Sequence, residues 1–504
     1  MASNQTIRLL LIFFLAFSAA ANNCSTKPLT LPIGNVTLGN GVAVNRGVYV
    51  KLGNQVTSLR LTTNLNNTGV RNALDCDLLN STARTVCLGA SGSIYAPESS
   101  NTWRQVSPDE FASNVSTIDT HAVGETVIVG YETAKFSSNV EVKGYPLEVW
   151  SNLTSTNRSG LAIGSGSSFL QKLLSVSAAP SRAFGLFYGS RSQSRPTDGA
   201  LTIGGIDLAR LKGRWSNHSA GMQGLDYSCP LQVRIKDIRL NNTKGSFSLL
   251  ADPQLTVPAC IDPQQNAFTF TQAIYNLWSN FTGHPANGSL PGEPPFTSQT
   301  YPKDREPLIG TLTVTLDDGF ETIIPHYELL SEERGNDAQG RYAVVNASRV
   351  MAAVSNDETL PVPILGGVYL SQNYLFVDYD KGTFHLATAD LDTHDQDIVP
   401  ICEGGATPSP SHGSRRLSGR KIAGIAVGVA AVVLIALALA LWWARYRTRQ
   451  DGAPRDGTSQ KETPQNGTSQ NGTSRDEASQ GGTHKDAELE PNERRQELPT
   501  SAPS

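Results

Sequence analysis

The sequence has no excess of positive charge and no recognisable metal-binding spacing. Its 41 lysine and arginine residues are outnumbered by 45 aspartate and glutamate residues, and the formal net charge is -4. A nucleic-acid-binding domain usually carries a basic patch, so we expect no nucleic-acid partner. No Cys-x-x-Cys pair and no zinc-type cysteine–histidine spacing occurs. The sequence therefore predicts neither a metal site nor a cofactor.

Long apolar runs are also scarce, and only two stand out. Residues 9–20 follow Arg8, are too short to cross a bilayer, and precede an Ala-x-Ala pattern at Ala19 and Ala21. We therefore expect residues 1–21 to be a cleaved signal peptide rather than an uncleaved anchor. Residues 422–443 contain no charge and end in Trp442 and Trp443. At about 1.5 Å per residue a helix of this length spans the hydrocarbon core.

Together the two runs predict a single-pass type I membrane protein. The part before residue 422 is expected to be lumenal or extracellular, and residues 444–504 cytosolic. This tail is polar and free of aromatic residues, so it cannot bury a core and should be disordered. Residues 403–421 are rich in Pro, Ser and Gly, which favours a flexible stalk.

The number of cysteines and the glycosylation sequons also indicate a protein of the secretory pathway. All six cysteines precede residue 403, and an even count in an oxidising compartment predicts three disulfides. The region before residue 422, which we expect to be lumenal or extracellular, also has many Asn-x-Ser/Thr sequons, which predict a glycoprotein. They begin at Asn35, Asn66, Asn80, Asn114, Asn152, Asn157, Asn217, Asn241, Asn280, Asn287 and Asn346.

The composition between about Leu29 and Ala387 is typical of an all-β protein. Short runs rich in Val, Ile, Leu, Tyr and Thr are separated by Gly, Asn, Asp, Ser and Pro. Only residues 167–174 and 269–280 look helical. So many short strands exceed one small sandwich, and a large bilobal β protein fits better.

Four segments carry a family resemblance. They are CLGASGSIYAPESSNTW (87–103), LAIGSGSSFLQKLL (161–174), FGLFYGSRSQSRPTDGALTIGGIDLARLKGRW (184–215) and LPVPILGGVYLSQNYLFVDYDKGTFHLATA (360–389). In this order and at this spacing the chain resembles the pepsin-like aspartic peptidases. The resemblance implies an all-β, bilobal fold, with one lobe over residues 22–200 and the other over residues 201–402.

The chemistry of that family requires two carboxylates a few ångströms apart, one ionised and one protonated. By alignment with the family, the first aspartate position falls on Thr62 or Thr63, and no carboxylate lies between Gly41 and Arg71. Asp252 matches the second position, but Pro253 and Gln254 follow it in place of the family's Thr/Ser-Gly pair. The resemblance therefore implies that the catalytic pair is incomplete.

The flap of the family is altered as well. The position of the flap tyrosine falls near Thr120, with His121 beside it. His121 is either a site residue or, as is commoner, a solvated histidine on a hairpin. For the disulfides, the resemblance implies Cys76–Cys87 as the local bridge and Cys24–Cys402 as the link between the two ends. That leaves Cys229 with Cys260.

These observations support a membrane-anchored pseudoenzyme that binds an extended peptide or another chain. The alternative is an active, surface-anchored aspartic endopeptidase with an unusual pair, Asp252 with Asp75 or Asp77. A third hypothesis is a sensor that signals through the tail, although nothing in the tail specifies a partner.

Overall fold

The computed structural model describes residues 24–405 except 78, 93, 116–117, 120–125, 138–139, 152–159, 222–228, 253, 284–298 and 394, together with residues 407, 438–443 and 445. The chain divides into two compact units, Met1–Ser414 and Arg415–Ser504. In the second unit, residues 438–443 are helical. All other elements below belong to the first unit.

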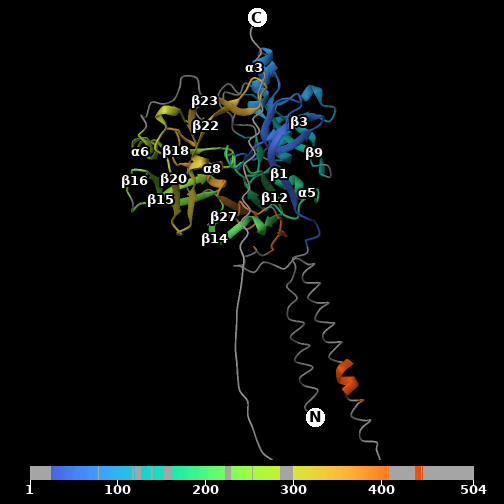
Figure 1. Cartoon of the computed structure of the whole chain (residues 1–504). Coiled ribbons are helices and arrows are strands. Elements are labelled where there is room, and N and C mark those ends of the chain that lie inside the picture. Colours follow the sequence, from blue (N-terminus) through green and yellow to red (C-terminus); the bar gives the residue numbers. More distant parts are fainter. Residues whose placement is uncertain are drawn as a thin grey trace, which may run out of the picture. The chain divides into compact units, whose positions relative to one another are not determined.

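The first unit is mostly β, as expected for an all-β chain (Figure 1). A 13-stranded sheet contains β1 (Leu29–Thr37), β2 (Val44–Leu52), β3 (Gln55–Leu59), β5 (Gly69–Asn72), β6 (Ile94–Tyr95), β7 (Arg104–Val106), β8 (Thr126–Ser137), β9 (Val140–Ser151), β11 (Phe184–Phe187), β12 (Gly199–Ile203), β14 (Leu211–Ser219), β26 (Asn373–Asp378) and β27 (Thr383–Ala389). An eight-stranded sheet contains β15 (Gln232–Asn242), β16 (Gly245–Ser248), β17 (Val257–Ile261), β18 (Phe268–Phe270), β20 (Thr311–Leu316), β21 (Glu321–Ile324), β24 (Val354–Asn356) and β25 (Ile364–Leu365).

Three smaller sheets complete the β structure. They are β19 (Gln299–Pro302), β22 (Leu330–Asn336) and β23 (Tyr342–Ala352); β4 (Leu61–Thr62) with β10 (Leu161–Ala162); and β13 (Gly205–Asp207) with β28 (Ile398–Pro400). The helices are short: α2 (Leu74–Asp77), α3 (Ser81–Ser91), α4 (Pro108–Asn114), α5 (Ser168–Ser175), α6 (Gln272–Thr282), α7 (His326–Leu329) and α8 (Gly367–Leu370), with single 3-10 turns η1 (Pro97–Ser99), η2 (Leu208–Arg210) and η3 (Lys303–Arg305).

Local sequence explains these elements. In β15 the buried residues Val233 and Ile235 alternate with exposed polar ones, which is the period-two pattern of a strand with one buried face. Helix α5 begins where the Ser167 hydroxyl accepts a hydrogen bond from the Leu170 N–H. Helix α6 ends at Gly283, whose positive φ of 74° suits glycine.

The large sheet combines strands from both ends of the unit. β11 pairs with β26, and β1 pairs with β12, so early and late strands share one sheet. The expected boundary between residues 200 and 201 falls inside β12, a continuous strand that pairs with β1 and β11. Within the unit, the structure therefore does not divide the chain at this position.

The three predicted disulfides are confirmed. Cys24–Cys402, Cys76–Cys87 and Cys229–Cys260 are bonded, with sequence separations of 378, 11 and 31 residues. Cys24–Cys402 ties together the first and the last parts of the described unit. Disulfides are compatible with a secretory or extracellular location.

Several sequence expectations fall on residues outside the described part of the chain. These are the signal peptide (1–21), most of the stalk (403–421), most of the apolar run (422–443) and nearly all of the tail (444–504). Among the helices that are described, none is long and apolar enough to cross a membrane.

We predict that replacing both Cys24 and Cys402 by serine lowers the free energy of unfolding by about 2–5 kcal/mol, because the disulfide restricts the unfolded chain. The matched control, Cys76→Ser with Cys87→Ser, opens a much shorter loop and should cost less. Urea unfolding of both variants measures the difference. If both double variants lose the same free energy of unfolding, or if the Cys76/Cys87 variant loses more, the Cys24–Cys402 disulfide does not stabilise the protein by restricting the unfolded chain.

Candidate functional site

Two strand ends that are distant in sequence meet in the first unit. β4 runs parallel to β10, with Thr62 opposite Ala162. β17 runs parallel to β25, with Ile261 opposite Leu365. A polar turn follows each strand, residues 63–68 after β4 and residues 262–267 after β17, and these two turns contact each other. The local arrangement is therefore repeated in the two halves of the chain.

The carboxylate of Asp262 is the centre of this contact. Its side chain is buried, and its Oδ1 accepts a hydrogen bond from the Gln264 N–H at 3.0 Å and a long one from the Thr63 N–H at 3.5 Å. Oδ2 accepts from Nδ2 of Asn64 at 2.8 Å. The Thr63 hydroxyl donates to the Ile261 carbonyl at 3.3 Å. Within the described residues, no second carboxylate hydrogen-bonds to Asp262.

Burial controls the protonation of this carboxyl group. Removal from water disfavours the charged form and raises the pKa of Asp262 to about 6, although hydrogen bonds from Gln264 and Thr63 act in the opposite direction. Its negative charge adds to the effect of burial in raising the pKa of Tyr379, whose hydroxyl donates to the Ile163 carbonyl at 2.9 Å. Asp262 is thus largely protonated below pH 6.

Two glycines allow the strands and turns to approach closely. A Cβ atom at Gly164 would lie 2.5 Å from the Thr63 carbonyl oxygen. A Cβ atom at Gly366 would lie 2.2 Å from the Ala267 carbonyl oxygen. Both glycines belong to the segments that carry the family resemblance, and each lies against the turn of its own half. Their positions are explained by close packing.

The structure places Thr62 at this junction but does not bring Asp252 to it. Thr62 is fully buried, and its hydroxyl accepts a hydrogen bond from the Asn64 N–H at 3.2 Å. Asp252 is exposed, and its Oδ1 accepts from the Gln254 N–H at 2.9 Å. The residue opposite the 63–64 turn is Asp262 and not Asp252, to which the resemblance assigned the second aspartate position.

Asp252 and Asp262 stand in two copies of the same tripeptide. Asp-Pro-Gln occurs twice, at residues 252–254 and 262–264. Only the second copy directly follows a strand, β17, that is flanked by a parallel partner. The signal that distinguishes the copies is the apolar run Val257–Ile261 immediately before Asp262, followed within a few residues by β18 and α6.

The other carboxylates considered for an unusual pair lie elsewhere or are not described. Asp75 on α2 accepts from Nε of Arg71 on β5 at 3.1 Å in a largely buried ion pair. The Asp77 side chain is outside the described part of the structure, as are the expected flap residues Thr120 and His121. The described residues also contain no group of three or more side chains arranged to hold a metal ion.

A buried carboxyl pair that the sequence did not reveal adjoins the 63–68 turn. Asp119 accepts hydrogen bonds from the N–H groups of Asn66 (3.0 Å) and Asn67 (2.9 Å). Glu148 on β9 accepts from the Asp119 N–H at 3.0 Å and from Nδ2 of Asn67 at 2.8 Å. Burial, with the nearby negative charge of Asp119, raises the pKa of Glu148 to about 8.

The sequons are only partly described. Asn35, Asn80, Asn114, Asn217 and Asn280 are exposed, while Asn66, Asn241 and Asn346 are half-buried. Asn152, Asn157 and Asn287 lie outside the described residues. Asn66 is the sequon nearest to the Asp262 junction in sequence, since it lies in the 63–68 turn.

We predict that Asp262 makes the fold less stable as pH rises from about 4 to about 6. Its pKa is higher in the folded than in the unfolded state, so the folded state binds more protons in this window and loses that advantage as the group ionises. The loss should be about 2 kcal/mol. Urea unfolding across this pH range should show a loss that is smaller by this amount in Asp262→Asn than in the wild type, and the slope that remains in the variant comes from other buried carboxyl groups such as Glu148. Equal slopes in the wild type and in Asp262→Asn would contradict the assignment.

Glu148 predicts a second pH dependence at higher pH. Between pH 6 and 8 its folded-state carboxyl is still protonated and its unfolded-state carboxyl is ionised, so stability falls by about 2 kcal/mol as pH rises. Glu148→Gln should remove this slope, whereas Asp262→Asn should retain it because that group has finished titrating. Identical behaviour of the two variants above pH 6 would argue against a buried protonated Glu148.

A scan against protein-family models and a search of curated proteins find no match to this chain.

Proposed function

We propose that this chain is a single-pass type I membrane glycoprotein whose first unit has an aspartic-peptidase-like, bilobal fold that no longer hydrolyses peptides. It acts at the cell surface or in an endomembrane lumen by binding, with an extended peptide or another chain as the ligand. The single observation that carries the proposal is that, among the described residues, Asp262 has no second carboxylate as a hydrogen-bond partner at the junction of the two turns.

Hydrolysis by such a fold requires a water molecule held between two carboxyl groups. One carboxylate removes a proton from the water, and the other carboxylic acid donates a hydrogen bond to the scissile carbonyl. Here Asp262 faces the amides of Thr63 and Asn64 instead of a second acid. A threonine hydroxyl has no accessible acid–base function near pH 5, so neither Thr62 nor Thr63 replaces the missing carboxylate.

The burial of Asp262 supports the same conclusion. Its side chain is only 1% exposed, and three N–H donors already approach its two oxygens. A catalytic carboxylate must bind the attacking water directly. In this arrangement the carboxyl group joins two turns and supports the structure.

The membrane and glycoprotein parts of the proposal rest on sequence and on the disulfides. The apolar run at 422–443, the expected signal peptide and the sequons all indicate the secretory route. Three disulfides in the first unit fit an oxidising compartment.

We predict that the purified full-length protein shows no pepstatin-sensitive cleavage of denatured protein substrates between pH 3 and pH 6. The decisive variants are Asp262→Ala and its matched control Asp252→Ala, which removes the aspartate of the exposed copy of the same tripeptide. Neither should change the background rate, measured as release of new amino termini.

Inhibitable cleavage that disappears in Asp262→Ala and persists in Asp252→Ala would overturn the proposal. Cleavage that disappears in Asp252→Ala would instead favour the unusual pair that includes Asp252.

A further inference from the structure

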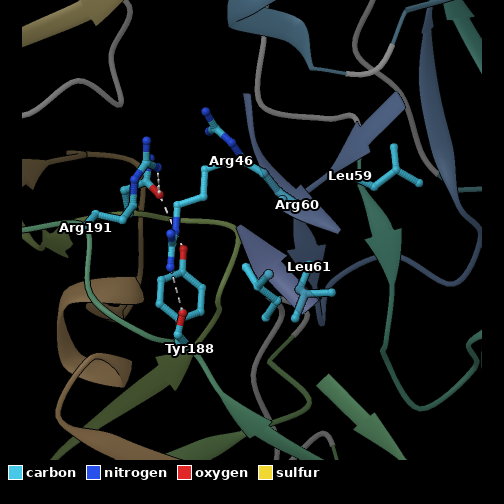
Figure 2. A pocket seen from close by; sticks show the side chains of 9 residues that line it. Arg46, Leu59, Arg60, Leu61, Tyr188 and Arg191 are labelled. Carbon is cyan, nitrogen blue, oxygen red and sulfur yellow. Dashed lines mark hydrogen bonds between the residues drawn. The ribbon is translucent and has the colours of Figure 1, made fainter. Parts of the chain in front are cut away.

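A small pocket lies beside the Asp262 junction and is lined by three arginines (Figure 2). Arg46 comes from β2, Arg60 from the link between β3 and β4, and Arg191 from the segment after β11. The pocket is connected to the junction by Tyr188, whose hydroxyl donates to the Pro263 carbonyl at 3.1 Å. It is formed by side chains from several separate segments, and all three cations belong to its wall.

Arg46 is the one arginine of the pocket with an acidic partner. Its Nη1 donates to Oδ1 of Asp198 at 3.0 Å, and its Nη2 donates to the Thr197 carbonyl at 2.8 Å. The Asp198 side chain is 77% exposed, so water weakens this ion pair.

Arg191 is held by neutral groups. Its Nη1 donates to Oδ1 of Asn266 at 2.6 Å, and its guanidinium lies 4.7 Å from the centre of the Tyr342 ring. The guanidinium of Arg334 lies over the same ring at 4.6 Å and adds another positive charge nearby. Within the described residues, neither arginine forms an ion pair with a carboxylate.

Arg60 is the least compensated of these cations. It is half-buried, and none of the described residues accepts a hydrogen bond from its guanidinium or forms an ion pair with it. Burial and the adjacent charge of Arg191 both lower the pKa of Arg60. Glu328 offsets part of the charge of Arg46 only when it is ionised: burial raises its pKa to about 6, and its Oε1 accepts from the Ser190 hydroxyl at 2.5 Å.

Like charges that are partly buried together are costly when they have few counter-ions, so such a cluster favours the binding of an anion. Guanidinium groups present paired N–H donors that match the oxygens of carboxylate and phosphate groups. The pocket has an empty volume of about 290 Å³, including open solvent at its mouth.

We propose that the pocket of Arg46, Arg60 and Arg191 is an oxyanion-binding site that takes a carboxylate or phosphate group. Arg60 and Arg191 supply positive charge that has no acidic partner among the described residues. Arg46 remains paired with Asp198 and adds to the positive electrostatic potential in the pocket. Anion binding at this site does not depend on any catalytic role of Asp262. The experiment on the pocket therefore tests this proposal independently of the proposed function.

The test is thermal unfolding and calorimetric titration of the purified full-length protein with inorganic phosphate and, separately, succinate. Sodium chloride at equal ionic strength is the reference, and millimolar concentrations avoid the general effect of salting-out ions. The two probes distinguish a phosphate from a carboxylate source. The variants are Arg60→Gln and Arg191→Gln, with Arg234→Gln on β15 as the matched control.

At least one probe should raise the unfolding midpoint above that in chloride for the wild type and for Arg234→Gln. Arg60→Gln and Arg191→Gln should each weaken its affinity about tenfold, the loss expected for one charge-assisted hydrogen bond. Without an anion, Arg60→Gln should leave the midpoint unchanged or raise it, because it removes an uncompensated charge.

The proposal is overturned if neither probe protects the wild type more than chloride does, or if Arg60→Gln and Arg191→Gln are protected as well as Arg234→Gln. A large fall in the midpoint of anion-free Arg60→Gln would also contradict it, because that result assigns the guanidinium a structural partner.

Discussion

The hydrogen bonds around the buried carboxyl group of Asp262 join the two halves of the repeated strand-and-turn arrangement. Asp262 follows β17, and its partners Thr63 and Asn64 follow β4, almost two hundred residues earlier. A buried polar group is tolerated only when it is hydrogen-bonded, so the turn after β4 must supply amide donors at fixed positions. Gly164 and Gly366 let the neighbouring strands approach closely enough for this to happen.

The same constraint explains why the junction has no hydrolytic machinery under our proposal. The Asp262 oxygens already accept hydrogen bonds from amide groups, so they cannot also bind the attacking water. One carboxyl group also cannot act as proton acceptor and proton donor at the same time. At acidic pH, Asp262 and Glu148 are both protonated in the fold, whereas the guanidinium groups of Arg60 and Arg191 remain charged. The region of the junction is therefore more positive in an acidic compartment, which favours the binding of an anionic group there.

The sequence predicted the all-β character because strand patterns are local signals. The even cysteine count predicted three disulfides, and the resemblance to the aspartic peptidases implied how they pair. The sequence also predicted α5 and α6 to within a few residues, although Thr269 and Phe270 belong to β18. It missed α3, which begins where the Asn80 side chain accepts from the Ala83 N–H, because this helix has a weak apolar face. The boundary expected between residues 200 and 201 falls inside β12, because the pairing of β12 with β1 is not visible in the sequence.

The site was harder to predict than the fold. Thr62 was placed at the junction by alignment, but two copies of Asp-Pro-Gln made the opposing aspartate ambiguous, and only strand pairing separates Asp262 from Asp252. Glu148 and the arginine pocket could not be predicted, because their partners come from distant segments. Both missed features are ionisable side chains that tertiary packing brings out of water, and neither hydrophobic periodicity nor motif spacing predicts such packing.

The central claim is that Asp262 has no carboxylate partner, and nuclear magnetic resonance can test it directly. The side-chain carboxyl carbons of aspartate would be labelled with 13C and followed from pH 3 to pH 8, with the Asp262 signal assigned by its absence in Asp262→Asn. Our account predicts one simple titration step near pH 6. Two coupled steps, with a second aspartate signal that changes its own titration in Asp262→Asn, would contradict it.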